Sequence, residues 1–208
     1  MEVFLILTKF GSLKITVKKY NIKKIFTVFL ISISASFIAG IYGAFHDQLT
    51  YTISPEYYTK FKFIQFNIIN ESNSSKITYI RFFVAIVGFL ATWWFGLILG
   101  FILALIGLVH KDWKTMYKVS LKSIFLALIV VFIFGLIGLF YGRFILSNQP
   151  ISHFQDWFIP KNLIDYKNFI SVASMHNFSY VGGIFGLIIG SIYSFKNRNS
   201  KPETCNSQ

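Results

Sequence analysis

Four long runs of apolar residues constrain this 208-residue chain more than any other feature. They extend from Ile25 to Phe45, from Phe82 to Val109, from about Ser123 to Leu146 and from about Phe178 to Phe195. The first run alone would form a helix about 31 Å long, close to the thickness of the hydrocarbon core of a bilayer. The sequence therefore predicts an all-α membrane protein, a bundle of four transmembrane helices.

Composition agrees with this prediction. Hydrophobic residues make up 54% of the chain and charged residues 13%, whereas soluble domains carry about a quarter charged residues. A cleaved signal peptide is the alternative for the first run, but the run is longer than such segments and lacks a small-x-small cleavage site. We therefore expect a basic segment over 1–24, a membrane domain over 25–195 and a polar tail over 196–208.

Charge predicts the orientation of the bundle. Thirteen basic residues against three acidic ones lie before the first run, between the second and third runs, and after the fourth. The other two loops and their flanks hold seven basic and five acidic residues. Because cytoplasmic segments carry the excess of Lys and Arg, both chain ends are expected in the cytoplasm, across a bacterial inner membrane.

Small residues recur at intervals of four in all four runs. Such ladders allow close approach of helix backbones, so we predict that they form the seams of a tightly packed bundle. The alternative is a homo-oligomeric channel in which the ladders face a shared axis. The predicted packing residues are Ser36, Gly40, Gly96, Gly100, Gly138, Gly142, Gly182, Gly186 and Gly190.

The two outer loops are expected to form a partly structured cap. Leu49–Ile53 alternates weakly, which is typical of a short strand. Ser54 followed by Pro55 predicts the start of a short helix. Asn162 and Asp165 predict the start of another helix, which we expect to lie along the membrane interface before the fourth span.

Several polar side chains fall at the outer ends of the spans in this topology. They are His46, Asp47, Gln48, Glu56, Arg143, His176 and Asn177. The favoured interpretation is a hydrogen-bonded cluster that attaches the outer loop to the helix ends. The alternative is a divalent metal site built from His46, Asp47, Glu56 and His176, since histidine and carboxylate can ligate such an ion.

No sequence motif assigns a reaction. The chain has no nucleotide loop, HExxH string or nucleophile–base pair, so we expect no cofactor and favour a non-enzymatic membrane protein. Its outer polar site would bind a small ligand, a lipid headgroup or a partner. The alternative is a membrane-embedded metal-dependent enzyme. Expected partners are the bilayer itself and a second copy or another membrane protein, and not nucleic acid.

Three strings carry a resemblance to a known family. They are Tyr42-Gly43 with His46-Asp47-Gln48, then Glu56-Tyr57-Tyr58-Thr59, then His176-Asn177-Phe178-Ser179-Tyr180 with Gly182-Gly183. These strings resemble those of a family of uncharacterised bacterial multi-span membrane proteins, and the resemblance covers about a third of the chain. The resemblance implies four spans and no known activity.

Overall fold

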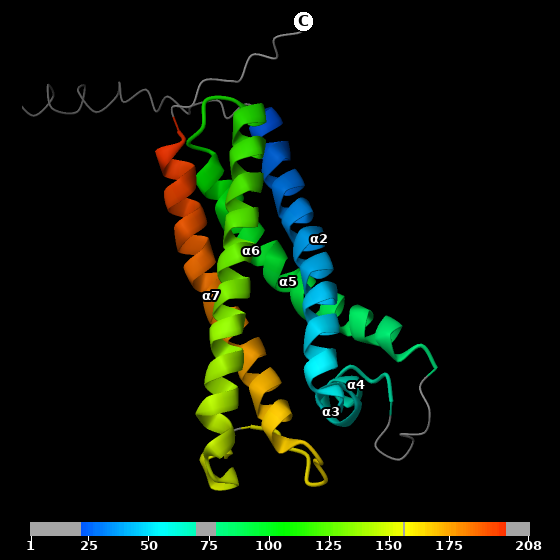
Figure 1. Ribbon diagram of the computed structural model, residues 1–208. Coiled ribbons are helices and arrows are strands. Elements are labelled where there is room, and N and C mark those ends of the chain that lie inside the picture. Colours follow the sequence, from blue (N-terminus) through cyan, green and yellow to red (C-terminus); the bar gives the residue numbers. More distant parts are fainter. Residues whose placement is uncertain (1–21, 70–77, 156, 199–208) are drawn as a thin grey trace, which may run out of the picture.

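The computed structural model describes residues 22–69, 78–155 and 157–198, and the regular elements in these ranges are all helical. Four long helices run antiparallel, so that Ile22 and Lys196 lie at the same end of the bundle (Figure 1). They are α2 (Ile22–Ile53), α5 (Ile80–Gly107), α6 (Trp113–Phe144) and α7 (Tyr166–Lys196). Each is long and apolar enough to cross a membrane. The predicted four-helix membrane bundle is confirmed, and the chain is a multi-pass membrane protein.

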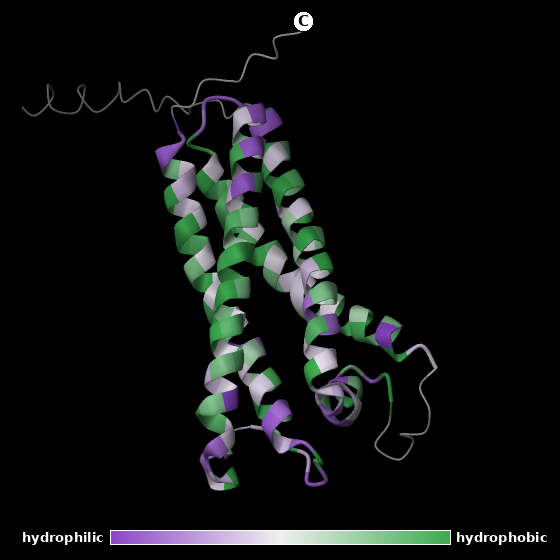
Figure 2. Cartoon of the chain, in the orientation of Figure 1, coloured by the Kyte–Doolittle hydropathy of each residue, from purple (hydrophilic) through white to green (hydrophobic). Residues whose placement is uncertain are grey.

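The outer surface of the bundle is apolar. Large side chains such as Phe37, Phe125 and Phe140 are more than half exposed. Figure 2 shows hydrophobic residues along the middle of the helices and hydrophilic residues gathered towards their ends. A continuous apolar belt of this kind is stable only when lipid covers it.

The helices associate as two close pairs. α2 packs along α5 and α6 along α7, whereas contacts between the pairs are sparse. Small residues line both seams: a Cβ added at Gly96 would lie 2.3 Å from the Ala39 Cβ, and one at Gly186 would lie 2.8 Å from the Ala127 carbonyl oxygen. The predicted ladders thus lie against helices of the same chain, rather than around an axis shared between copies.

The remaining predicted packing residues lie in the same two seams. Ser36 donates a hydrogen bond to the Trp93 carbonyl. A Cβ added at any of the other predicted glycines would force a neighbouring residue to move. Gly40 faces Phe89, Gly100 faces Ala35, Gly138 and Gly142 face Ser174, Gly182 faces Phe134 and Gly190 faces Ser123.

The first outer connection differs from the prediction. Leu49–Ile53 is not a strand but the last turn and a half of α2, because no proline or glycine interrupts the helix before Pro55. Three short helices follow: α3 (Pro55–Tyr57), the π-helix η2 (Tyr58–Lys62) and α4 (Phe63–Gln65). The predicted helix start at Ser54 and Pro55 is confirmed, although the Ser54 side chain makes no capping hydrogen bond.

The second outer connection corrects another prediction. Two 3₁₀ turns, η3 (Leu146–Asn148) and η4 (Ile151–Phe154), lead to α7, which begins directly after Asp165. The Asp165 carboxylate caps this helix by accepting from the Asn168 N–H at 3.0 Å. The separate interfacial helix is therefore wrong: its residues form the first turns of α7, which continues unbroken into the fourth span.

The opposite end of the bundle is joined by polar contacts. The Lys24 Nζ donates to the carbonyls of Leu108 and His110, which ties α2 to the turn between α5 and α6. The buried His110 Nε2 lies 3.0 Å from the Ser194 Oγ on α7. Most of the predicted basic segment and polar tail lies outside the described residues.

Candidate functional site

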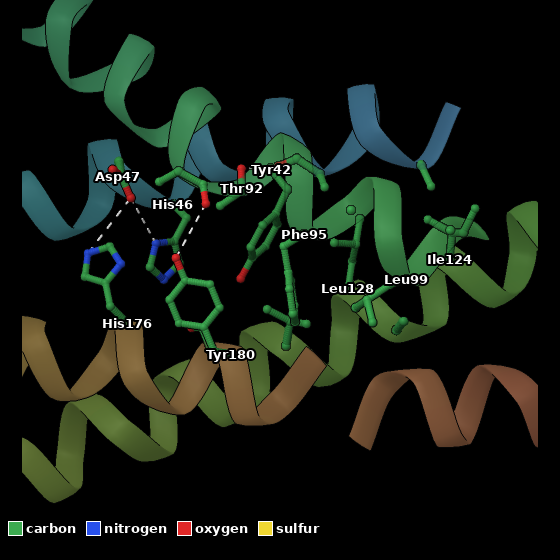
Figure 3. A pocket seen from close by; sticks show the side chains of 18 of the residues that line it. Tyr42, His46, Asp47, Thr92, Phe95, Leu99, Ile124, Leu128, His176 and Tyr180 are labelled. Carbon is green, nitrogen blue, oxygen red and sulfur yellow. Dashed lines mark hydrogen bonds and ion pairs between the residues drawn. The ribbon is translucent and has the colours of Figure 1, made fainter. Parts of the chain in front are cut away.

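Two histidines and one aspartate meet between α2 and α7 (Figure 3). The Asp47 Oδ1 lies 3.4 Å from the His46 Nδ1 and 3.9 Å from the His176 Nε2. The two imidazole centroids are 5.0 Å apart. The structure thus brings together three of the predicted polar residues. His46 and Asp47 are adjacent in the sequence, and His176 lies 130 positions after His46.

These three side chains lie inside the bundle rather than at a helix exit. Asp47 is 2% exposed and His46 7%. α2 continues for one and a half further turns beyond them, and α7 begins ten residues before His176. The extra helical turns and the cap cover the cluster, so its charges and dipoles act in a poorly solvated space, where interactions are stronger than in water.

Aromatic rings fix the orientation of both imidazoles. The Tyr57 ring stacks on His176 with a centroid distance of 5.0 Å and an interplanar angle of 11°. Tyr42 lies one helical turn before His46, with its ring centroid 5.7 Å away. Tyr180 lies one turn after His176 and its hydroxyl is 3.5 Å from the Ala91 carbonyl. Sequence reasoning missed both tyrosines as site residues, although their spacing of four from a histidine places them on the same helix face.

Several buried polar atoms in this cluster have no hydrogen-bond partner within the described residues. They are the Tyr42 hydroxyl, the His46 Nε2, the Asp47 Oδ2 and the His176 Nε2. Most buried polar groups in proteins are satisfied, and an unsatisfied one costs about 1–3 kcal/mol. The favoured interpretation from the sequence, a hydrogen-bonded attachment, accounts poorly for atoms that are left unpaired.

A cavity extends from the cluster into the space between the two helix pairs. The space free of protein atoms there is about 820 Å³, a figure that includes space open to the surroundings. Apart from its polar end, the walls are almost entirely apolar: Ala35, Ala39, Ala91, Phe95, Leu99, Leu103, Leu128 and Val131 all line it. On α2 the lining runs from Asp47 back to Ala35, about 18 Å along the helix. Figure 3 shows the polar residues gathered at one end of this space and the apolar ones at the other.

Glu56, a predicted member of the cluster, has another role. Its carboxylate accepts hydrogen bonds from the backbone N–H of Ile164 and Asp165 and from Lys60. Burial raises the pKa of Glu56, but these hydrogen bonds outweigh it and hold the pKa below its ordinary value. Glu56 thus fastens the cap to the start of α7 and is not available as a metal ligand.

Three other predicted residues also lie outside the cluster. Arg143 donates to the Asn168 side chain, which links α6 to the first turn of α7. Gln48 donates to the Arg81 carbonyl at 2.7 Å and so joins α2 to α5. Asn177 is exposed and lines an outer hollow beside the cap. The sequence placed these side chains at the correct end of the bundle but could not show which way they point.

Lys62 is a site residue that sequence reasoning missed. It lines both the inner cavity and the outer hollow, as His176 and Tyr180 also do, and so lies between the two spaces. Its Nζ donates to the Gln65 Oε1 at 3.0 Å and lies 5.3 Å from the Phe61 ring centroid. Burial lowers the pKa of Lys62, while the Asp47 carboxylate opposes this shift. Lys62 is the last residue of the π-helix Tyr58–Lys62. No sequence pattern predicts this π-helix, so the sequence did not indicate that Lys62 lines the cavity.

No protein-family model matches the chain, and neither curated proteins nor solved structures give a match. The resemblance carried by the three sequence strings therefore stays a prediction. All three strings do contribute to one region of the fold: the first supplies His46 and Asp47, the second Tyr57, and the third His176 and Tyr180.

Proposed function

We propose that this protein is a non-enzymatic membrane protein that binds an amphipathic, lipid-like molecule inside its bundle. The apolar chain of the ligand would occupy the space between the helix pairs. Its head would lie against His46, Asp47 and His176. The observation that carries this proposal is the division of the cavity into a long apolar part and one polar end.

The lining of the cavity supports a small-molecule ligand. Ligand pockets are mostly apolar and hold a few well-placed polar groups, and this cavity has a long apolar wall with polar side chains gathered at one end. The two helix pairs make few contacts with each other, so a chain between them would add apolar contacts that the protein itself lacks.

The unpaired polar atoms support a head with hydrogen-bonding oxygens. A hydroxyl, carboxylate or phosphate could bond the His176 Nε2 or the Tyr42 hydroxyl, which have no hydrogen-bond partner within the described residues. The Lys62 ammonium, which lines the same cavity, adds a positive charge that favours an anionic head. Lys62, His176 and Tyr180 also line the outer hollow, and a head could enter from that side.

The charge distribution completes the proposal. In the sequence, the excess of Lys and Arg lies before the first run, between the second and third runs, and after the fourth, and the cluster residues lie at the other ends of the spans. With both chain ends in the cytoplasm of a bacterial cell, the polar site would face the outer side of the inner membrane. The ligand would then be taken from the outer leaflet or from the solution beyond it.

The test is to fill the cavity and follow a bound molecule. Leu128 lines the cavity, whereas its neighbour Ile129 is 57% exposed on the outer face of α6. Purified wild-type protein is expected to carry a lipid-like molecule detected by mass spectrometry after extraction and by native mass spectrometry. Leu128→Trp should remove at least nine-tenths of it, because the indole occupies the same space, and Ile129→Trp should leave it in place.

Two results would contradict this function. One is a wild-type protein that carries no bound molecule in gentle detergent and takes up none from a total lipid extract. The other is a folded Leu128→Trp protein whose bound molecule is undiminished. Circular dichroism on both variants shows whether the bundle is intact.

A further inference from the structure

We infer that His46, Asp47 and His176 bind one divalent transition-metal ion of the Zn²⁺ type. One ligand atom from each of the three residues can be chosen so that all three lie within 4.8 Å of one another. Within the described residues, this is the one group of three or more His, Cys, Asp or Glu side chains with that spacing. The inference does not depend on the lipid-like ligand, because the ion would be held by side chains alone.

The distances suit an ion with small adjustments. Four-coordinate Zn²⁺ has bonds of about 2.0–2.1 Å to nitrogen and oxygen, which places neighbouring ligand atoms about 3.3 Å apart. The contacts of Asp47 Oδ1 to the two histidines are 3.4 and 3.9 Å. Both are longer than good hydrogen bonds, and they exceed the spacing around Zn²⁺ by about 0.1 and about 0.6 Å, so the histidines would move slightly towards Asp47 when an ion binds.

The donor atoms favour a transition metal over Ca²⁺ or Mg²⁺. Imidazole nitrogen suits Zn²⁺, Fe²⁺ or Co²⁺, whereas Ca²⁺ and Mg²⁺ are bound by oxygen atoms. Two histidines and one carboxylate also leave coordination positions open. Here the open positions would face the cavity, so the head of a bound molecule could complete the coordination.

The surroundings of the cluster are compatible with an ion. One carboxylate reduces the net charge of a divalent ion to one, and burial in an apolar setting strengthens its attraction to Asp47. The nearest cation lining the cavity is Lys62, whose Nζ is already engaged by Gln65 and by aromatic faces. Stacking of Tyr57 holds the His176 ring in place, as outer groups commonly do for ligating histidines.

The experiment uses the full chain in detergent with any affinity tag removed. After treatment with a chelator, Zn²⁺ is titrated in competition with a coloured chelator, and Co²⁺ is added separately as a spectroscopic probe. We expect one ion per chain and visible Co²⁺ bands typical of four or five nitrogen and oxygen ligands. His176→Gln and Asp47→Asn should each weaken Zn²⁺ binding by at least about 100-fold, since even groups behind the ligands contribute about 10–100-fold.

His153→Gln is the matched control, because His153 is exposed on the outer connection and lies outside the cluster. It should bind Zn²⁺ as the wild type does. If His176→Gln fails to fold, the nearly isosteric Asp47→Asn carries the test. Absence of saturable binding, or equal weakening in His153→Gln, would overturn the inference.

The two proposals fail separately. If the cluster is only structural, His176→Gln should lower the melting temperature, and the wild type should bind no stoichiometric metal. This combination would refute the metal site alone. Wild-type protein that binds one Zn²⁺ per chain but carries no lipid-like molecule, and takes up none from a total lipid extract, would refute the ligand alone.

Discussion

Two acidic side chains near the same end of the bundle have opposite environments. The Glu56 oxygens accept from two backbone N–H groups and from Lys60. Asp47 is more deeply buried, yet within the described residues its Oδ2 has no hydrogen-bond partner, and the contacts of its Oδ1 with the two histidines are long. A carboxylate whose lone pairs are filled by the backbone is structural, whereas one with free lone pairs in a buried cluster is available to an ion or ligand.

The Glu56 attachment predicts a pH dependence of stability. Because the folded-state pKa of Glu56 lies below its ordinary value of 4.5, its contribution is fully present well above pH 4.5. That contribution is lost as the pH falls through the folded pKa, where the carboxylate takes up a proton. Glu56→Gln should therefore lower the melting temperature at pH 7 by several degrees and flatten the decline between pH 5 and pH 3, relative to the wild type.

Thermal unfolding in detergent, followed by circular dichroism, measures this effect. Lys161→Gln changes the charge by one unit at an exposed position of the second outer connection and serves as a control for net charge alone. If Glu56→Gln melts as the wild type does at both pH 7 and pH 4, the Glu56 hydrogen bonds do not stabilise the cap.

The sequence could identify the three clustered residues but not exclude their neighbours. His46, Asp47 and His176 follow from topology, since two antiparallel spans place them at one level. Glu56 was assigned to the same cluster because it lies at the same end. Its actual partners, the N–H groups of Ile164 and Asp165, are more than a hundred positions away. Only the folded connection brings those donors near.

At the scale of elements, apolar runs identify the spans but not the ends of the helices. α2 extends eight residues beyond the first run and α7 begins twelve residues before the fourth. The added turns mix polar with apolar residues, so they give no continuous apolar run, yet nothing in them breaks a helix before Pro55 or after Tyr166. These turns contain both the His46–Asp47 pair and His176, which explains why the cluster is buried rather than at an exit.

The α2–α5 seam predicts a strong dependence on one glycine that was not among the predicted packing residues. A Cβ at Gly43 would lie 2.2 Å from the Gly88 carbonyl oxygen, which is backbone and cannot move aside. A Cβ at Gly190, in the α6–α7 seam, would meet its nearest atom at 3.1 Å. Gly43→Ala should destabilise the bundle by about 1–3 kcal/mol or more, as overpacking does, and Gly190→Ala by much less.

Folded yield in detergent and unfolding by increasing amounts of a denaturing detergent compare the two variants. Equal stability of Gly43→Ala and Gly190→Ala would mean that α2 and α5 are not in backbone contact at this level. The comparison is matched, because both changes add one methyl group to a buried glycine of a transmembrane helix.

At the scale of the whole molecule, the pairing of helices determines where the cavity lies. All four spans carry similar small-residue ladders, so the sequence could not show that α2 pairs with α5 and α6 with α7. This pairing leaves sparse contacts along the junction between the pairs, and the cavity occupies that junction. The polar cluster lies at one end of it, and Leu103 and Ile124, which pack with Met116 in an apolar core, line the other.

The orientation of the molecule decides which compartment supplies the cluster. In the sequence, thirteen basic residues lie before the first run, between the second and third runs, and after the fourth, and seven lie in the other two loops and their flanks. Since cytoplasmic segments retain Lys and Arg, reporters fused after Lys24, Lys118 and Lys201 should give a cytoplasmic signal. Reporters fused at Asn73 and at Pro160 should be active only outside. A pair of reporters, one active in each compartment, should give complementary signals at every site, and membrane fractionation controls for expression.

A cytoplasmic signal at Asn73 would reverse the orientation. Any metal ion or lipid-like molecule would then reach His46, Asp47 and His176 from the cytoplasm rather than from outside.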